Sequence, residues 1–149
     1  AKAVKFLLTK NADVNALDDD HNTLLHKDID SGCVEVVREL LQKGAKVDAV
    51  NKFGEAPLIY ALTRNKPNPK IVEVLIEFNA NVNHIAKNGY TILEMAYSIN
   101  CEECLDKLLQ ADKLQVNSKN ALGKTPLHLL AAKGNFKAVE TLLIKGAEV

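Results

Sequence analysis

The arrangement in this chain best suited to chemistry is a cysteine pair, Cys101-Glu-Glu-Cys104. Two cysteines separated by two residues at the start of a helix can be redox-active or can bind a metal ion. Glu102 and Glu103 would raise rather than lower the pKa of a neighbouring thiol, and the chain has no second pair of this kind. We therefore interpret the pair as packing residues, and we expect both thiols and that of Cys33 to be free, with no bound metal.

The four histidines give no recognisable metal site or catalytic group. His21 occupies the position of a turn glycine, and neither His21 nor His84 has acidic or cysteine neighbours at ligand spacing. His26 and His128 recur at one position of a repeated motif. No nucleophile stands in the strand-to-helix turn of a hydrolase, and no glycine-rich phosphate loop is present. The sequence therefore predicts neither an enzyme active site nor a cofactor in this chain.

Composition narrows the class of protein. The chain has 149 residues, 47% of them apolar, and a formal net charge of zero, which is enough to bury a sizeable core. A balanced charge without tryptophan gives no general reason to expect nucleic acid, and no apolar run approaches the roughly 18 residues of a membrane span. Three cysteines cannot all pair together, which favours a reducing compartment. We expect a cytoplasmic protein, monomeric as isolated, with secretion as the alternative.

Two landmarks recur along the chain at one period. Segments that begin at Thr23, Ala56, Thr91 and Thr125 are spaced by 33, 35 and 34 residues. A second series keeps step with them and consists of the apolar pairs Leu7-Leu8, Leu40-Leu41, Leu75-Ile76, Leu108-Leu109 and Leu142-Leu143. A fixed period between 20 and 50 residues is typical of stacked repeat proteins.

Each repeat unit predicts two short helices. In the last unit, Thr125 can cap a helix with its hydroxyl, Pro126 has the φ angle preferred at the first helical position, and Gly134 ends the helix. Val139 and Leu142 fall at helical spacing in a second helix. A pair of short helices cannot bury its own apolar face, so neighbouring units must stack. We expect this stacking to bury Leu40, Leu41, Leu75, Ile76, Leu108 and Leu109.

The strings Thr125-Pro-Leu-His-Leu-Leu-Ala-Ala-Lys-Gly134 and Leu40-Leu-Gln-Lys-Gly-Ala-Lys-Val-Asp48 closely resemble the ankyrin repeat, and the resemblance covers the whole chain. It implies an all-α solenoid of stacked helix-turn-helix units, with projecting β-turns, called fingers, and an extended concave surface. The expected single ankyrin-repeat domain, 1–149, consists of a half repeat and four repeats, 1–16, 17–49, 50–84, 85–118 and 119–149. We expect the native protein to continue with further repeats, at least on the N-terminal side.

Departures from the repeat pattern carry their own expectations. The resemblance implies that the histidine of the motif links adjacent turns, but the third and fourth units have Ile59 and Glu94 at this position, which leaves their links open. Asp28 stands where the family usually has a buried alanine. An insertion before the second helix of the third unit places Asn68 and Pro69 where they can start a helix again.

Three asparagines, Asn15, Asn83 and Asn117, resemble positions that asparaginyl hydroxylases modify in this family. The simpler interpretation is that each is a turn residue, and we favour it while leaving hydroxylation open.

Positions that vary between repeats while the framework stays fixed are candidates for recognition of a partner. The predicted partner-binding residues are Asp19, Asp20, Asn22, Asp30, Lys52, Phe53, Glu55, Arg64, Lys87, Tyr90, Ser98, Leu122, Lys124 and Lys133. Between Leu17 and Glu35 there are six acidic residues and one lysine, whereas Ser118 to Lys137 contains four lysines and no acidic residue. We therefore expect a surface that is acidic near one end and basic near the other.

Three functions fit these observations. The leading hypothesis is a non-catalytic scaffold or adaptor module that binds another protein through its concave face and fingers, without binding nucleic acid or inserting into a membrane. The alternative is a structural segment of a large secreted toxin or bacterial effector. A third hypothesis is an ankyrin segment attached to an enzyme whose chemistry lies outside these residues. The sequences that flank the segment would discriminate among them.

Overall fold

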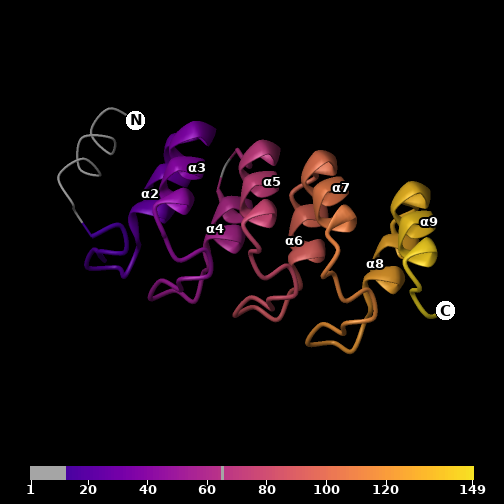
Figure 1. Ribbon diagram of the computed structural model, residues 1–149. Helices are drawn as coiled ribbons and strands as arrows, with labels where there is room; N and C mark the ends of the chain where they lie inside the picture. Colours follow the sequence, from indigo (N-terminus) through magenta and orange to yellow (C-terminus); the bar gives the residue numbers. More distant parts are fainter. Residues whose placement is uncertain (1–12, 65) are drawn as a thin grey trace. The chain divides into compact units, whose positions relative to one another are not determined.

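The computed structural model describes residues 13–64 and 66–149, which form eight helices (Figure 1). The chain divides into two compact units, Ala1–Asn81 and Val82–Val149, which we describe separately. Within the described residues, β pairing is limited to an isolated bridge between Ile85 and Thr91. The predicted all-α class is therefore confirmed.

The first unit contains two helix pairs. Helix α2 (Leu24–Ser31) packs on α3 (Val34–Gln42), and α4 (Pro57–Thr63) packs on α5 (Pro69–Glu77). The pairs stack through α2 against α4 and α3 against α5. The first helices of the pairs thus lie in one layer and the second helices in another.

The second unit has the same organisation. Helix α6 (Ile92–Ser98) packs on α7 (Glu102–Gln110), and α8 (Pro126–Ala132) packs on α9 (Phe136–Ile144). Contacts of α6 with α8 and of α7 with α9 join the two pairs. Stacking of like helices therefore closes the apolar core that neither pair could bury alone.

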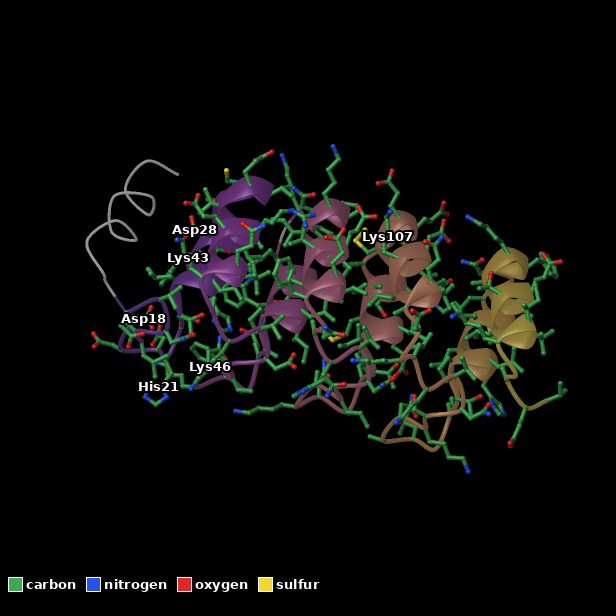
Figure 2. All side chains as sticks on the ribbon, viewed as in Figure 1. Asp18, His21, Asp28, Lys43, Lys46 and Lys107 are labelled. Carbon is green, nitrogen blue, oxygen red and sulfur yellow. A yellow bond between two sulfur atoms is a disulfide. The ribbon has the colours of Figure 1, made fainter. Side chains whose placement is uncertain are left out.

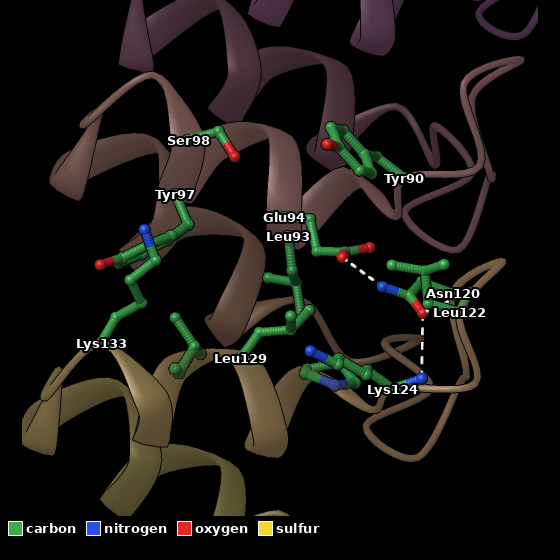
Figure 3. Close-up of a pocket in the computed structure, with 12 residues that line it drawn as sticks. Tyr90, Leu93, Glu94, Tyr97, Ser98, Asn120, Leu122, Lys124, Leu129 and Lys133 are labelled. Carbon is green, nitrogen blue, oxygen red and sulfur yellow. Dashed lines mark hydrogen bonds between the residues drawn. The ribbon is translucent and has the colours of Figure 1, made fainter.

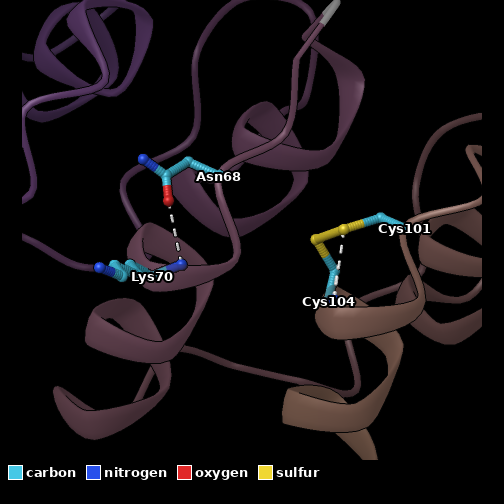
Figure 4. The surroundings of a disulfide bond; sticks show 4 residues. All are labelled: Asn68, Lys70, Cys101 and Cys104. Carbon is cyan, nitrogen blue, oxygen red and sulfur yellow. Dashed lines mark hydrogen bonds between the residues drawn. A yellow bond between two sulfur atoms is a disulfide. The ribbon is translucent and has the colours of Figure 1, made fainter.

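Local capping explains where the helices begin. The hydroxyl of Thr91 accepts a hydrogen bond from the Glu94 N–H, and that of Thr125 accepts one from the His128 N–H. The Asn68 side chain accepts from the Lys70 N–H at 3.0 Å, with Pro69 at the first helical position of α5 (Figure 4). The predicted restart of the helix after the insertion is confirmed.

The six residues expected in the core are buried, with one exception. Leu40, Leu41, Leu75, Leu108 and Leu109 are at most 6% exposed.

The expectation for Ile76 is wrong, because this side chain is only half-buried. Helix α5 buries its stripe through Ile71, Val72, Val74 and Leu75, and Ile76 lies at the edge of that stripe. The first members of the apolar series, Leu7-Leu8, fall outside the described residues.

Four loops, 18–22, 51–55, 86–90 and 120–124, precede the first helices and form the fingers, which project from the helices in each unit (Figure 1). In each finger, the N–H of the first residue donates to the carbonyl of the fifth at 2.9 to 3.1 Å. The fourth residue has a positive φ, between 73° and 81° where it is glycine and 60° at His21. Figure 2 labels His21, which lies on the first of these fingers. The sequence-based assignment of His21 to a turn-glycine position is confirmed.

Neighbouring fingers bond directly to each other within each unit. The Ala121 N–H donates to the Gly89 carbonyl at 3.2 Å, and the Lys52 N–H donates to the Asp20 carbonyl at 3.0 Å. A Cβ on Gly89 would lie 2.5 Å from the Cβ of Ala121, so this position requires glycine for close approach as well as for its φ. Backbone contacts thus hold adjacent fingers in register.

The prediction of free thiols at Cys101 and Cys104 is wrong, because these residues form a disulfide (Figure 4). One turn at the start of α7 brings their Cα atoms to 5.2 Å, within the span that a disulfide bridges. Sequence reasoning considered the acidity of the thiols and overlooked their distance. Cys104 is nevertheless fully buried, as its packing position predicted, and Cys33 is free.

Truncation of Leu108 to alanine should lower the free energy of unfolding by about 2 to 5 kcal/mol, because it removes a fully buried side chain from the core of α7. Urea unfolding followed by circular dichroism measures the change. The matched variant Leu122→Ala, in an exposed finger, should change stability by no more than about 0.5 kcal/mol. Equal losses in the two variants would contradict this packing register.

Thiol titration tests the corrected cysteine assignment. Of the three cysteines, the two in the disulfide should not react, so the denatured chain should show one thiol without reductant and three after reduction. Three reactive thiols in a sample never exposed to reductant would contradict the disulfide.

Candidate functional site

A buried histidine connects the first helix of the second repeat to the next finger. His26 is fully buried on α2, and its Nε2 lies 3.1 Å from the backbone carbonyl of Glu55. A carbonyl can only accept, so Nε2 carries the proton and Nδ1 accepts from the Thr23 N–H at 3.2 Å. The expected link between adjacent turns is therefore present at His26.

Glu94 makes an equivalent link with a carboxylate, so the fourth unit has the link that the sequence left open. One carboxylate oxygen accepts from the Thr91 N–H at 2.7 Å, as the His26 ring does at its own cap. The other accepts from the side-chain amide of Asn120 in the next finger at 2.5 Å (Figure 3). Two carboxylate oxygens thus replace the two ring nitrogens, a possibility that the residue type alone could have indicated.

The three asparagines considered for hydroxylation each bridge to the loop after the next second helix. The Asn83 amide donates to the Lys113 carbonyl at 2.8 Å and its oxygen accepts from the Gln115 N–H at 2.7 Å. Asn15, two repeats earlier, and Asn117, one repeat later, make the same two kinds of bond. These contacts give the asparagines a structural role, while hydroxylation stays a prediction.

In the first unit, three predicted site residues, Asp30, Glu55 and Arg64, lie around a tyrosine, Tyr60, that sequence reasoning missed. The Tyr60 hydroxyl donates to the Asp30 carboxylate at 2.7 Å, and the Arg64 guanidinium lies 3.9 Å from the centre of the Tyr60 ring. Arg64 also lies 3.5 Å from the Glu55 carboxylate. Burial, followed by the bond to Asp30, raises the pKa of Tyr60 to about 12. The signal that could have found Tyr60 is its repeat position, which also varies between units.

Another predicted site residue, Lys52, belongs to the finger of the same repeat. Lys52 forms an ion pair with Asp20, and its ammonium lies 5.3 Å from the centre of the exposed Phe53 ring. Asp19 is exposed, whereas Asn22 is buried and accepts from the Asn51 amide at 3.0 Å. The structure thus assigns Asn22 a role inside the finger.

In the second unit, a hollow of about 250 Å³ opens between α6 and α8 (Figure 3). Five predicted site residues line it: Tyr90, Ser98, Leu122, Lys124 and Lys133. The other lining residues, which sequence reasoning did not select, are Leu93, Glu94, Tyr97, Asn120, Pro126, Leu129 and Leu130. The predicted Lys87 is exposed in the preceding finger and is not among the lining residues.

Ion pairs within each unit reduce the charge contrast expected from the sequence. Lys27 lies 2.7 Å from Asp18 and holds the pKa of that carboxyl well below its usual range. Among the four lysines of the basic stretch, Lys137 pairs with Asp106 at 2.5 Å. The acidic and basic stretches therefore carry less free charge than the residue count indicates.

No group of three or more metal-ligating side chains comes together among residues 13–64 and 66–149. In the same part of the chain, none of the helices has the length and apolar character that crossing a bilayer requires.

Comparisons with known proteins relate this chain to one family. It matches the family model for ankyrin repeats (three copies) over residues 1–85, 43–120 and 64–149. It is 41% identical to the mouse B-cell lymphoma 3 protein homolog over 75 residues, which cover 50% of this chain and 16% of that protein. It is 35% identical to the NAD-dependent deacetylase sir2B of Dictyostelium discoideum over 99 residues, covering 65% of this chain and 12% of that protein.

A third relative is the phosphocholine transferase AnkX of Legionella pneumophila, 29% identical over 81% of this chain and 13% of its own length. In each of these three proteins the match covers less than a fifth of the relative.

The free energy of unfolding should decrease as the pH falls, because His26 takes up a proton more readily in the unfolded chain. Burial lowers the pKa of His26 below its ordinary 6.5, so the unfolded chain takes up the proton first as the pH falls. His26 therefore contributes fully above about pH 6.5, and its contribution declines below it by at most about 1.4 kcal/mol per pH unit. Unfolding free energies between pH 7.5 and 5.5 should show this slope in the parent chain and lose it in His26→Gln.

The control is His128→Gln, which changes an exposed histidine and should keep the slope. Burial also raises the pKa of Asp28, but that contribution is common to all three proteins and cancels in the comparison. An unchanged slope in His26→Gln would assign the pH dependence to another group.

Proposed function

The chain belongs to the ankyrin-repeat family, and we propose that it is a scaffold or adaptor segment that binds a partner protein through its fingers and first helices. Members of this family are generally modules for protein–protein interaction, which gives the proposal its class. The side chains exposed on its fingers and first helices indicate where a partner would bind.

The observation that carries the proposal is an exposed apolar side chain in three successive fingers. Phe53 is 54% exposed, Tyr90 44% and Leu122 76%. Phe53 and Leu122 have a lysine within two residues, Lys52 and Lys124. Exposed apolar side chains rimmed by polar ones are typical of interaction surfaces, and aromatic residues contribute strongly to binding energy there. Within each unit, the bonds between neighbouring fingers would present these side chains without rearrangement.

The proposed contact residues follow from the same geometry. In the first unit they are Asp19, Asp20, Asp30, Lys52, Phe53, Glu55 and Arg64, while the buried Tyr60 supports Asp30 and Arg64. In the second unit they are Lys87, Tyr90, Ser98, Leu122, Lys124 and Lys133. Asn22 is left out because it is buried. We propose that these residues bind and do not catalyse, and that the partner is a protein.

A second candidate, a segment of a secreted toxin or effector, is favoured by the disulfide. Disulfides persist mainly outside reducing compartments, so the bond between Cys101 and Cys104 removes the cysteine argument for a cytoplasmic location. Two of the matched relatives carry the names of enzymes, which keeps the hypothesis of an attached catalytic domain open to test. The complete parent sequence would show whether the segment belongs to an adaptor, to a secreted toxin or effector, or to an enzyme.

Removal of the exposed finger side chains should weaken binding without unfolding the chain. We expect a display library of short random peptides to yield sequences that bind the parent, and the triple variant Phe53→Ala/Tyr90→Ala/Leu122→Ala to bind them at least about tenfold more weakly. Each change should cost no more than about 0.5 kcal/mol in stability. Surface plasmon resonance measures the affinities.

A matched control is Ile144→Ala, which truncates an 81% exposed side chain on the second helix α9. It should leave the affinities unchanged. Failure of the library to yield any specific binder, or equal losses in the control, would contradict the proposal.

A further inference from the structure

We propose that the hollow between α6 and α8 binds one aliphatic or aromatic side chain of an extended partner segment, whose neighbouring carboxylate lies against Lys124 and Lys133. This inference rests on the proposed function and specifies the chemistry of the partner at one site.

The size of the hollow fits a single side chain. Its volume is about 250 Å³. Sites for whole small molecules typically measure about 300 to 1,000 Å³, so this one is small for a complete ligand. Leu93 and Leu130, both nearly fully buried, form its base together with Pro126. An apolar side chain placed there would be removed from water on several sides.

Amphipathic side chains flank this apolar base. In Figure 3, Leu93 and Leu129 lie near the middle of the hollow, with Lys133 beside Tyr97 at one end and Tyr90 with Leu122 at the other. Rigid aromatic rings lose little conformational entropy on binding, and leucines add apolar area. These walls favour an aliphatic or aromatic occupant over a polar one.

The charge at the hollow is positive. Lys124 and Lys133 are exposed lining residues, and neither forms an ion pair within the described part of the chain. Glu94 is the one acidic lining residue, and both its oxygens already accept hydrogen bonds, from Thr91 and Asn120. Its carboxylate is also buried, so the accessible charge is that of the lysines. A partner carboxylate is the complementary group.

The spacing within an extended segment suits this pair of contacts. An extended chain advances about 3.3 Å per residue, so an acidic residue one or two positions from the apolar one can reach a lysine at the rim. The occupant is therefore an acidic segment with a single large apolar residue, such as a leucine between glutamates.

A titration of the ¹⁵N-labelled chain tests the inference. The probe is a capped peptide with one leucine flanked by glutamates, and two matched peptides replace either the leucine by serine or the glutamates by lysine. We expect saturable amide shifts at residues lining the hollow, with the serine and lysine peptides binding at least about tenfold more weakly.

Two charge-reversal variants complete the test. The variant Lys124→Glu/Lys133→Glu should bind the acidic probe about tenfold or more weakly than the parent does, and it should bind the lysine peptide more tightly. The control Lys43→Glu/Lys46→Glu makes the same charge change at exposed positions of the first unit and should leave both unchanged. The dispersed amide spectrum of each variant shows that it is folded.

Four outcomes would overturn the inference: no saturable shifts, shifts away from the hollow, equal binding of the serine peptide, or unchanged affinity in Lys124→Glu/Lys133→Glu. Tighter binding of a single-stranded oligonucleotide at the same residues would also overturn it. The library selection distinguishes the two proposals, because peptides that bind the fingers without using the hollow would leave the proposed function standing.

Discussion

The structure depends on a bond that, within each unit, joins the start of one repeat's first helix to the finger of the next repeat. A short helix pair cannot bury its own apolar face, so every repeat relies on its neighbour for a core. His26 and Glu94 are buried at the N-terminal turns of α2 and α6, and each satisfies both its own helix cap and the next finger. A polar group buried there without a partner would cost about 1 to 3 kcal/mol, so these bonds specify the register of stacking.

The fixed framework leaves other positions free to vary. Backbone bonds between neighbouring fingers and asparagine bridges behind the second helices hold each unit together without using the finger tips. The tips can therefore carry exposed apolar and charged side chains, such as Phe53 and Leu122, whose exposure has no structural purpose in the described residues. In this account stability and recognition are assigned to different residues of the same repeat.

Much of the fold could be predicted because the same sequence pattern, and with it the same structural unit, occurs several times in the chain. Recurring leucines gave the core, and the positive φ of His21 followed from the glycines that occupy its position in other fingers. The sequence was less informative where one residue departs from the repeat. Glu94 was judged by its difference from histidine and not by its ability to accept two bonds. The disulfide depends on a distance between Cys101 and Cys104 that acidity arguments ignore.

The candidate site was predicted only in part, because variation between repeats identifies exposed positions but not which of them meet. It selected Tyr90 and Lys133 and missed Tyr97, a residue of α6 that lines the same hollow beside Lys133. Amide hydrogen exchange of the chain, with and without a binder selected from an unbiased library, tests the central claim most directly. The account predicts protection in the fingers and first helices. Protection confined to the second helices α3, α5, α7 and α9 would contradict it.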